Sequence, residues 1–230
     1  MTTIFSYGGY FTASPNALAL GSDGNFYGTD NENGDQNNYG TIFQITPAGV
    51  ETPLYTFGTS GFLDGQYPYA GLRQGSDGNF YGTTQDGGEN QLETVYKVAP
   101  EGAETVIYSC RGPDQNKPIF TDHIIPSASL ILGSDANFYG TSLGGGTYGA
   151  GAVFKITATG NEAVLYSSSG NGAVPGSPDG AYPSSGVIYA SDGNFYGTTN
   201  MGGAYNQGTI FKVTPTGVGT VSIPAAATVA

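Results

Sequence analysis

The side chains best suited to catalysis are few in this chain. His123 is the single histidine, and it follows Asp122 in the longest connection between two patterned stretches. A serine hydrolase needs a histidine that is oriented by a carboxylate and lies within reach of a serine. Only Ser127 or Ser129 could serve, by proximity in the sequence. Because adjacent residues seldom form such a device, His123 is better explained as a loop residue with a backbone partner.

Other routes to chemistry are also weak. Cys110, the single cysteine, ends an apolar segment, so we expect it to be buried rather than nucleophilic. One histidine does not make a histidine-based metal site. The 18 acidic residues leave a glycosidase-type carboxylate pair open, because a sequence gives no separations. We therefore expect a protein that is not an enzyme, and a polysaccharide-acting hydrolase ranks third among the functions considered.

A repeated phrase carries a different possible chemistry. Ser-Asp-Gly-Asn-Phe-Tyr-Gly at residues 22–28 returns, nearly unchanged, at 76–82, 134–140 and 191–197. Carboxylate and amide oxygens suit Ca²⁺, but the phrase lacks the alternating oxygen ligands of an EF-hand loop. Asp-Gly is also a common hairpin turn. We expect four structural turns, with the tyrosines of the phrase in the core: Tyr27, Tyr81, Tyr139 and Tyr196.

Four short segments surround each copy of the phrase. An apolar run precedes it, Asn-Phe-Tyr-Gly-Thr forms the second segment, and β-branched and aromatic runs follow, bounded by Gly, Pro, Asn and Asp, which are strand and turn signals. A unit that repeats every 50 to 60 residues or so is typical of a repeat architecture. We predict an all-β, four-bladed β-propeller with four antiparallel strands per blade, because radial closure buries both faces of each blade.

The expected boundaries follow the repeats. Residues 1–223 form a single propeller, residues 2–7 close the last blade as its outer strand, and residues 224–230 form a flexible tail. By analogy with other four-bladed propellers, an ion such as Ca²⁺ could occupy the central channel, although no cofactor is required. The four sequence repeats cover about 10–60, 61–112, 113–170 and 171–223.

The motifs resemble a known bacterial family. DGNFYGTT, a loop containing Gly-Gly, GTIFKVTPTG and a following aromatic strand resemble the tandem repeats called Gloeo/Verruco repeats, over almost the whole chain. Departures include Ala136 at a turn glycine and Ala152 at a strand threonine. The resemblance implies a secreted or surface-anchored bacterial protein without an assigned catalytic motif.

The net charge of the chain limits the classes of partner that it could bind. The net charge of -12, with only six basic residues, argues against nucleic acid and anionic membranes, which need a cationic surface. No stretch is long and apolar enough to span a membrane. Met1 leads directly into patterned sequence, as in a cytoplasmic protein or a mature exported one, and the resemblance favours an extracellular or cell-surface location. The expected partners are other protein subunits, with N-terminal strand exchange as one route to oligomers, or surface glycans.

Binding is expected where the copies differ. The loops after the second strands and the connections between units share one face of the predicted disc, and loops on a rigid scaffold usually carry function. This face should be acidic in its first half, through Asp30, Glu32, Asp35, Asp86, Glu89 and Glu93. The first-ranked function is a structural assembly or protein-interaction module, and the alternative is a carbohydrate-binding propeller. The candidate ligand-binding residues are Asp35, Asn37, Tyr39, Glu89, Asn90, Tyr148, Tyr182, Tyr205 and Asn206.

Overall fold

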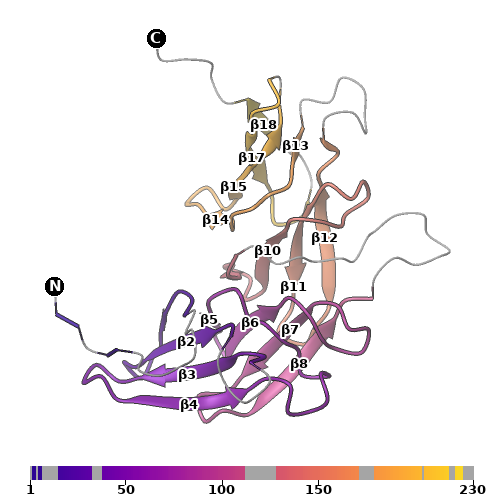
Figure 1. The fold of residues 1–230 in the computed structure, drawn as a ribbon. Helices are drawn as coiled ribbons and strands as arrows, with labels where there is room; N and C mark the ends of the chain where they lie inside the picture. The colour runs from indigo at the N-terminus through magenta and orange to yellow at the C-terminus, as the bar shows by residue number, and fades with distance from the viewer. Residues whose placement is uncertain are drawn as a thin grey trace. The chain divides into compact units, whose positions relative to one another are not determined.

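The structure is a computed structural model, and each of its named elements is a β-strand (Figure 1). The chain divides into two compact units, Met1–Cys110 with Ala158–Gly160, and Arg111–Thr157 with Asn161–Ala230, which we call the first and second units. No helix in the described part of the chain is both long and apolar enough to cross a membrane. The structure describes residues 2–3, 5–6, 15–32, 38–111, 128–170, 179–203, 205–217 and 221–224.

The first unit contains two four-stranded antiparallel sheets whose strands follow each other in chain order. The first sheet consists of β1 (Ala19–Leu20), β2 (Phe26–Asp30), β3 (Thr41–Ile45) and β4 (Glu51–Thr56). The second consists of β5 (Arg73–Gln74), β6 (Phe80–Thr84), β7 (Thr94–Val98) and β8 (Glu104–Ser109).

The second unit repeats this pattern and adds a ribbon of two strands, β13 (Gly180–Ala181) and β16 (Met201–Gly202). At the corresponding repeat position, the first unit has only an isolated bridge, between Gln66 and Asp86. One four-stranded sheet consists of β9 (Ile131–Leu132), β10 (Phe138–Ser142), β11 (Ala152–Ile156) and β12 (Glu162–Ser167). The other consists of β14 (Ile188–Tyr189), β15 (Phe195–Thr199), β17 (Thr209–Val213) and β18 (Val221–Pro224).

The predicted closing strand is wrong in this structure. We expected residues 2–7 to supply the outer strand of the last sheet, but β18 pairs with β17 there, and its last residue, Pro224, belongs to the predicted tail. The turn at Pro215–Gly217 leads directly towards β18. A hairpin partner so close in the chain closes a short loop, which costs less entropy than recruiting the distant N-terminus.

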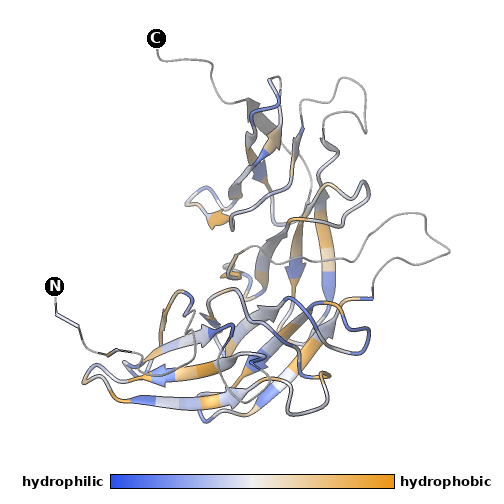
Figure 2. Cartoon of the chain, in the orientation of Figure 1, coloured by the Kyte–Doolittle hydropathy of each residue, from blue (hydrophilic) through white to orange (hydrophobic). Residues whose placement is uncertain are grey.

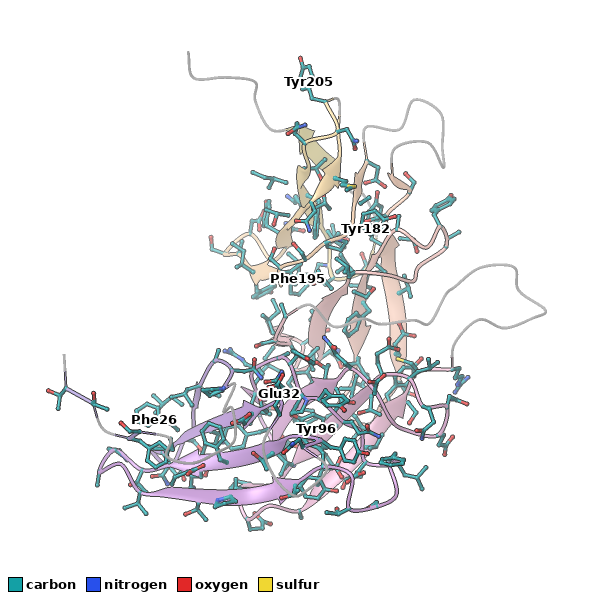
Figure 3. All side chains as sticks on the ribbon, in the orientation of Figure 1. Phe26, Glu32, Tyr96, Tyr182, Phe195 and Tyr205 are labelled. Atoms are coloured by element: carbon teal, nitrogen blue, oxygen red, sulfur yellow. The ribbon has the colours of Figure 1, made fainter. Side chains whose placement is uncertain are left out.

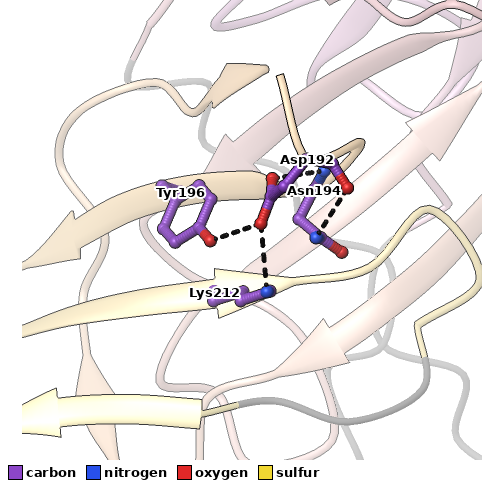
Figure 4. Close-up of polar contacts among 4 residues, drawn as sticks. All are labelled: Asp192, Asn194, Tyr196 and Lys212. Carbon is purple, nitrogen blue, oxygen red and sulfur yellow. Dashed lines mark hydrogen bonds and ion pairs between the residues drawn. The ribbon is translucent and has the colours of Figure 1, made fainter. Parts of the chain in front are cut away.

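The repeated phrase forms a hydrogen-bonded turn, which confirms its structural role. In each copy the aspartate accepts a bond from the backbone N–H two residues later and another from the strand tyrosine hydroxyl, at 2.8 to 2.9 Å. In the last copy Lys212 adds an ion pair to Asp192 at 3.1 Å (Figure 4). The turn spans four residues, Gly21–Gly24 in the first copy, closed by a bond from Gly24 N–H to the Gly21 carbonyl.

Paired aromatics of the second strands join neighbouring sheets within each unit. Tyr27 stacks on Phe80, with ring centroids 3.9 Å apart, and Tyr139 stacks on Phe195 at 4.0 Å. Adjacent residues of a strand point to opposite faces, so Phe and Tyr can each meet a different neighbour. The outer strands β4, β8 and β12 are less buried and mix hydrophilic with hydrophobic residues (Figure 2). The core of each unit therefore lies between its sheets.

The glycine that ends each phrase also has a packing role. A side chain at Gly28 would meet the ring of Phe43, and one at Gly140 would meet the ring of Phe154. Both rings come from the third strand of the same sheet. The sequence Phe-Tyr-Gly therefore supplies two aromatic side chains, and its glycine leaves room for the aromatic ring of the third strand.

Candidate functional site

Three of the predicted binding residues meet at one cavity in the second unit. Tyr148, Tyr182 and Asn206 come from three different loops and line a cavity of about 310 Å³. The remaining lining residues are Ala150, Ser169, Gly170, Ala181 and Met201.

The floor of this cavity is small and buried, whereas its rim is aromatic and exposed. Ala150, Ser169 and Ala181 are each less than a tenth exposed. The side chains of Tyr148 and Tyr182 are 49% and 41% exposed. A ligand that enters the cavity would therefore meet two half-exposed aromatic rings.

The backbone fixes Tyr182 in place. Its N–H donates to the Ala150 carbonyl at 2.8 Å, and its own carbonyl accepts from Asn200 N–H at 3.2 Å. These bonds hold φ at 56°, a left-handed conformation that is uncommon for a bulky residue. Tyr67 has the same conformation in the first unit, with φ 57° and the matching bond to the Tyr39 carbonyl. Such strain persists only where the surroundings over-determine it, so the scaffold sets the backbone position from which the Tyr182 ring extends.

Polar groups of the cavity are also held by hydrogen bonds. Ser169 donates to Asp179 through its N–H, at 2.9 Å, and through its hydroxyl, at 3.0 Å. The side-chain oxygen of Asn206 accepts from Gly202 N–H at 3.0 Å. No charged residue is among the described residues that line the cavity. The site can therefore offer hydrogen bonds and aromatic contacts to a neutral ligand.

The equivalent place in the first unit is filled by an aromatic ring. Tyr39 stands where the second unit has Ala150, since both immediately precede the glycine that leads into the third strand. The ring of Tyr39 packs edge-on against Phe62 at 5.2 Å and Tyr67 at 5.9 Å. It also lies against Gly58, the counterpart of Ser169, where a side chain would clash with it. The predicted residue Tyr39 is thus a packing residue.

The other predicted site residues do not join the cavity. Glu89 and Asn90 are exposed in the first unit, and Asn90 donates to the Cys110 carbonyl at 2.9 Å. Tyr205 is 69% exposed and extends away from the strands (Figure 3). Asp35 and Asn37 lie outside the described residues.

The acidic surface expected on the first unit is smaller than predicted. Asp30, the last residue of β2, and Glu93, which precedes β7, are buried, at 1% and 3% exposure. Glu32, Asp86 and Glu89 are exposed, as expected. In the second unit Met201 takes the place of Asp86, which keeps charge away from the cavity.

Residues with catalytic potential are not gathered at this site. Cys110 is buried, as predicted, and Asp122 and His123 lie outside the described residues. Among the described residues there is no group of three or more His, Cys, Asp or Glu that could hold a metal ion.

Sequence reasoning missed the floor of the cavity. The floor residues Ala150 and Ser169 and the exposed lining residue Met201 were not predicted, although the first unit has a different residue at each of these repeat positions: Tyr39, Gly58 and Asp86. Comparing the two halves position by position could have indicated the exchange of the large Tyr39 for the small Ala150. The direction in which each side chain points was not available from the sequence.

Solved structures that resemble this chain are β-propeller proteins. A streptogramin B lyase structure aligns with a TM-score of 0.54 at 18% identity, over 93% of this chain and 55% of the lyase. The extracellular domain of a hybrid two-component system from B. thetaiotaomicron aligns with a TM-score of 0.58 at 12% identity, over 96% of this chain and 23% of that one. A protein of unknown function from Dyadobacter fermentans aligns with a TM-score of 0.55 at 9% identity, over 91% of this chain and 63% of that one.

These likenesses show the fold alone, and the chain spans less than two thirds of each of these structures. No curated protein was found to match the sequence. The model of the Gloeobacter/Verrucomicrobia repeat matches residues 1–123 and again 120–227, and the chain therefore belongs to the Gloeobacter/Verrucomicrobia repeat family.

Proposed function

We propose that this protein is a non-catalytic β-propeller module that binds a neutral carbohydrate at a bacterial surface. The observation that carries the proposal is the cavity of the second unit, where Tyr148 and Tyr182 present half-exposed rings above a small, buried floor. The surface location rests on the family resemblance.

The chemistry of the cavity favours a sugar over other small ligands. A sugar ring has apolar C–H faces that pack on aromatic rings, and hydroxyl groups that need hydrogen-bond partners. Tyr148 and Tyr182 supply the first, while Asn206 and Ser169 supply polar atoms. The absence of charge among the described lining residues disfavours phosphorylated or cationic ligands.

The size of the cavity agrees with a small occupant. Sites for small molecules span about 300–1,000 Å³, and this cavity of about 310 Å³ is at the lower end. One sugar unit of a longer glycan would fill it, with the rest of the chain in solvent.

A glycan array probed with the purified protein tests the proposal. We expect binding to neutral glycans, weakened by about tenfold or more in Tyr148→Ala, since aromatic anchors often contribute more than about 1 kcal/mol. Tyr205→Ala is the matched control, because Tyr205 is exposed but does not line the cavity. Silence across a broad array, or equal losses in both variants, would contradict the proposal.

Assembly is a second candidate function, and one observation favours it. Leu18, which precedes β1, is 51% exposed, and Leu20, which lies in β1, is 65% exposed. Ile188 in β14 is 68% exposed. Contiguous exposed apolar residues mark contact surfaces for other proteins, and Leu18 and Leu20 lie together at the edge strand β1 of the first unit. Light scattering would decide, since a building block should form oligomers that Leu20→Ser weakens, whereas a monomer at all concentrations would exclude this function.

A further inference from the structure

The first unit contains a second polar cluster, away from the cavity. Its members are Tyr55 in β4, Asp64 in the connection between β4 and β5, Tyr96 in β7 and Glu104 in β8. They therefore come from both sheets of the first unit. Asp64 is 3% exposed and Tyr96 is 0% exposed (Figure 3 labels Tyr96).

Tyr55 and Glu104 both lie close to Asp64. Tyr55 donates to Asp64 Oδ2 at 2.6 Å, and Glu104 is near enough for the charge of Asp64 to act on it. Thr59 adds its N–H and its hydroxyl to the same Asp64 oxygen, at 3.2 and 3.3 Å. Burial, the hydrogen bond to Asp64 and the charges of Glu104 and Asp64 all raise the pKa of Tyr55, so the two carboxylates lie near one hydroxyl group and a single small ion could reach both.

Three buried oxygens of the cluster have no hydrogen-bond partner among the described residues. They are Asp64 Oδ1, Tyr96 Oη and Glu104 Oε1. A buried polar atom without a partner costs about 1–3 kcal/mol, and more if it is charged. Native proteins rarely leave three such atoms together, so the cluster indicates a missing occupant.

The cluster is also electrostatically uncompensated. Within the described part of the chain, no Lys or Arg side chain forms an ion pair with Asp64 or Glu104. Burial and the charge of Asp64 raise the pKa of Glu104 to about 8. Burial, together with the charge of Glu104, also raises the pKa of Tyr96 well above its usual value.

The second unit satisfies the same position without counterparts of Tyr96 and Glu104. Asp179, the counterpart of Asp64, accepts bonds from Ser169 and from Gly180 N–H at 2.9 Å. Phe211 replaces Tyr96, so no hydroxyl is buried there. The sequence between Gly217 and Pro224 has no acidic residue to match Glu104. The additional oxygens of the first unit are therefore not needed to build the repeat.

We propose that Asp64 and Glu104, with a tyrosine hydroxyl, hold one hard divalent cation such as Ca²⁺ between the two sheets of the first unit. Such ions take oxygen ligands, and carboxylates are the usual anionic ones. The cation would neutralise both carboxylates and give the buried oxygens a partner. Water would complete the coordination sphere, since Ca²⁺ takes about six to eight oxygen ligands. The ion would thereby connect the β4–β5 segment to β8 and stabilise the first unit.

Calorimetric titration of metal-stripped protein with CaCl₂ tests this site, with MgCl₂ and NaCl as comparison salts. We expect one Ca²⁺ per chain and a higher melting temperature in its presence, because a ligand that binds only the folded state stabilises it. Glu104→Gln should weaken binding by about tenfold or more, since it removes one of two anionic ligands. Tyr96→Phe, which copies the second unit, should weaken it less.

Glu162→Gln is the matched control, because Glu162 opens β12 at the same repeat position as Glu104 opens β8. Its Ca²⁺ affinity should equal that of the unmodified protein. Glu104→Gln removes a buried charge and keeps the shape of the side chain, so it should fold, which its melting curve verifies. Absence of Ca²⁺ binding at millimolar concentration, or unchanged affinity in Glu104→Gln, would overturn the proposal.

Discussion

The two units share one scaffold but differ at the positions that could bind a ligand. In the first unit, Tyr39 packs between Phe62 and Tyr67 and fills the space beside the connecting loop. In the second unit, Ala150 leaves that space as a cavity below Tyr148 and Tyr182. The exchange of one large side chain for a small one therefore separates a packed site from an open one.

At the buried aspartates it is the first unit, not the second, that has the incompletely satisfied site. Asp179 of the second unit is satisfied by Ser169 and Gly180, whereas Asp64 of the first unit retains an unpartnered oxygen among the described residues, near Glu104. A repeat can thus carry a different site in each half while the turns and core aromatics stay the same. The comparison suggests that function in this fold is introduced by a few substitutions around an unchanged frame.

Removal of the Tyr39 ring should have the largest effect on stability. Tyr39→Ala leaves a hole beside Gly58, Phe62 and Tyr67, and large-to-small changes of aromatic residues cost about 3 kcal/mol when the site cannot collapse. Tyr148→Ala is the control in the second unit. It should change the unfolding free energy by less than about 0.5 kcal/mol, because the ring is half exposed. Equal losses in urea denaturation would show that both rings are packing residues.

A smaller effect is expected at the one turn that departs from the repeat. Ala136 has φ 59°, where the other three turns have glycine at φ 79° to 84°. Ala136→Gly should raise the unfolding free energy by about 0.5–1 kcal/mol, since it relieves a left-handed alanine and loses part of the gain to unfolded-chain entropy. Ala163→Gly, in the regular strand β12, should lower stability instead. Thermal denaturation of both variants compares their stabilities. A lower stability of Ala136→Gly than of the unmodified protein would contradict the prediction.

The turn aspartates should make stability depend on acid pH. Burial raises the pKa of Asp77, but hydrogen bonds from Tyr81 and Asn79 outweigh it and place the pKa below its ordinary value of 3.8. An aspartate with a lowered folded-state pKa stabilises the protein above its unfolded pKa, and this contribution is lost as pH falls through the folded pKa.

Asp77→Asn should therefore flatten the fall of stability below about pH 4, by no more than about 1 kcal/mol because solvent screens this exposed turn. Denaturant titrations at several acid pH values measure the slope. In the second unit, Asp192→Asn should lower the salt dependence of stability at neutral pH, because it also removes the salt-screened ion pair with Lys212. An unchanged acid slope in Asp77→Asn would show that the turn bonds do not titrate with folding.

The repeated parts of the fold could be predicted from the sequence. Each of the four copies of the phrase lies in a four-stranded antiparallel sheet, and a fifth, two-stranded sheet was not predicted. The adjacent Phe and Tyr were expected to face opposite neighbours, as in the stacks of Tyr27 on Phe80 and Tyr139 on Phe195. Local turn chemistry and period-2 patterning determine both features. The outer strand of the last sheet was mispredicted because two segments of similar composition competed for it.

The site could be predicted only in part. Tyr148, Tyr182 and Asn206 were predicted because they lie in loops where the copies differ, and they line one cavity, whereas Tyr39 was predicted on the same ground and packs against other rings. Asp64 and Glu104 were not identified, since their proximity depends on how the connection folds between two sheets. Loop position indicates variability, whereas exposure depends on neighbours that are distant in the sequence.

Filling the cavity tests the central claim most directly. The double variant Ala150→Tyr/Ser169→Gly copies Tyr39 and Gly58 of the first unit, and the added glycine gives the new ring the space that Ser169 would deny it. Isothermal titration with a neutral glycan found on the array should show binding by the unmodified protein and a loss of about a hundredfold or more, worth about 2.7 kcal/mol, in the double variant. Its melting temperature should stay close to that of the unmodified protein. Undiminished glycan binding with the cavity filled would contradict the account.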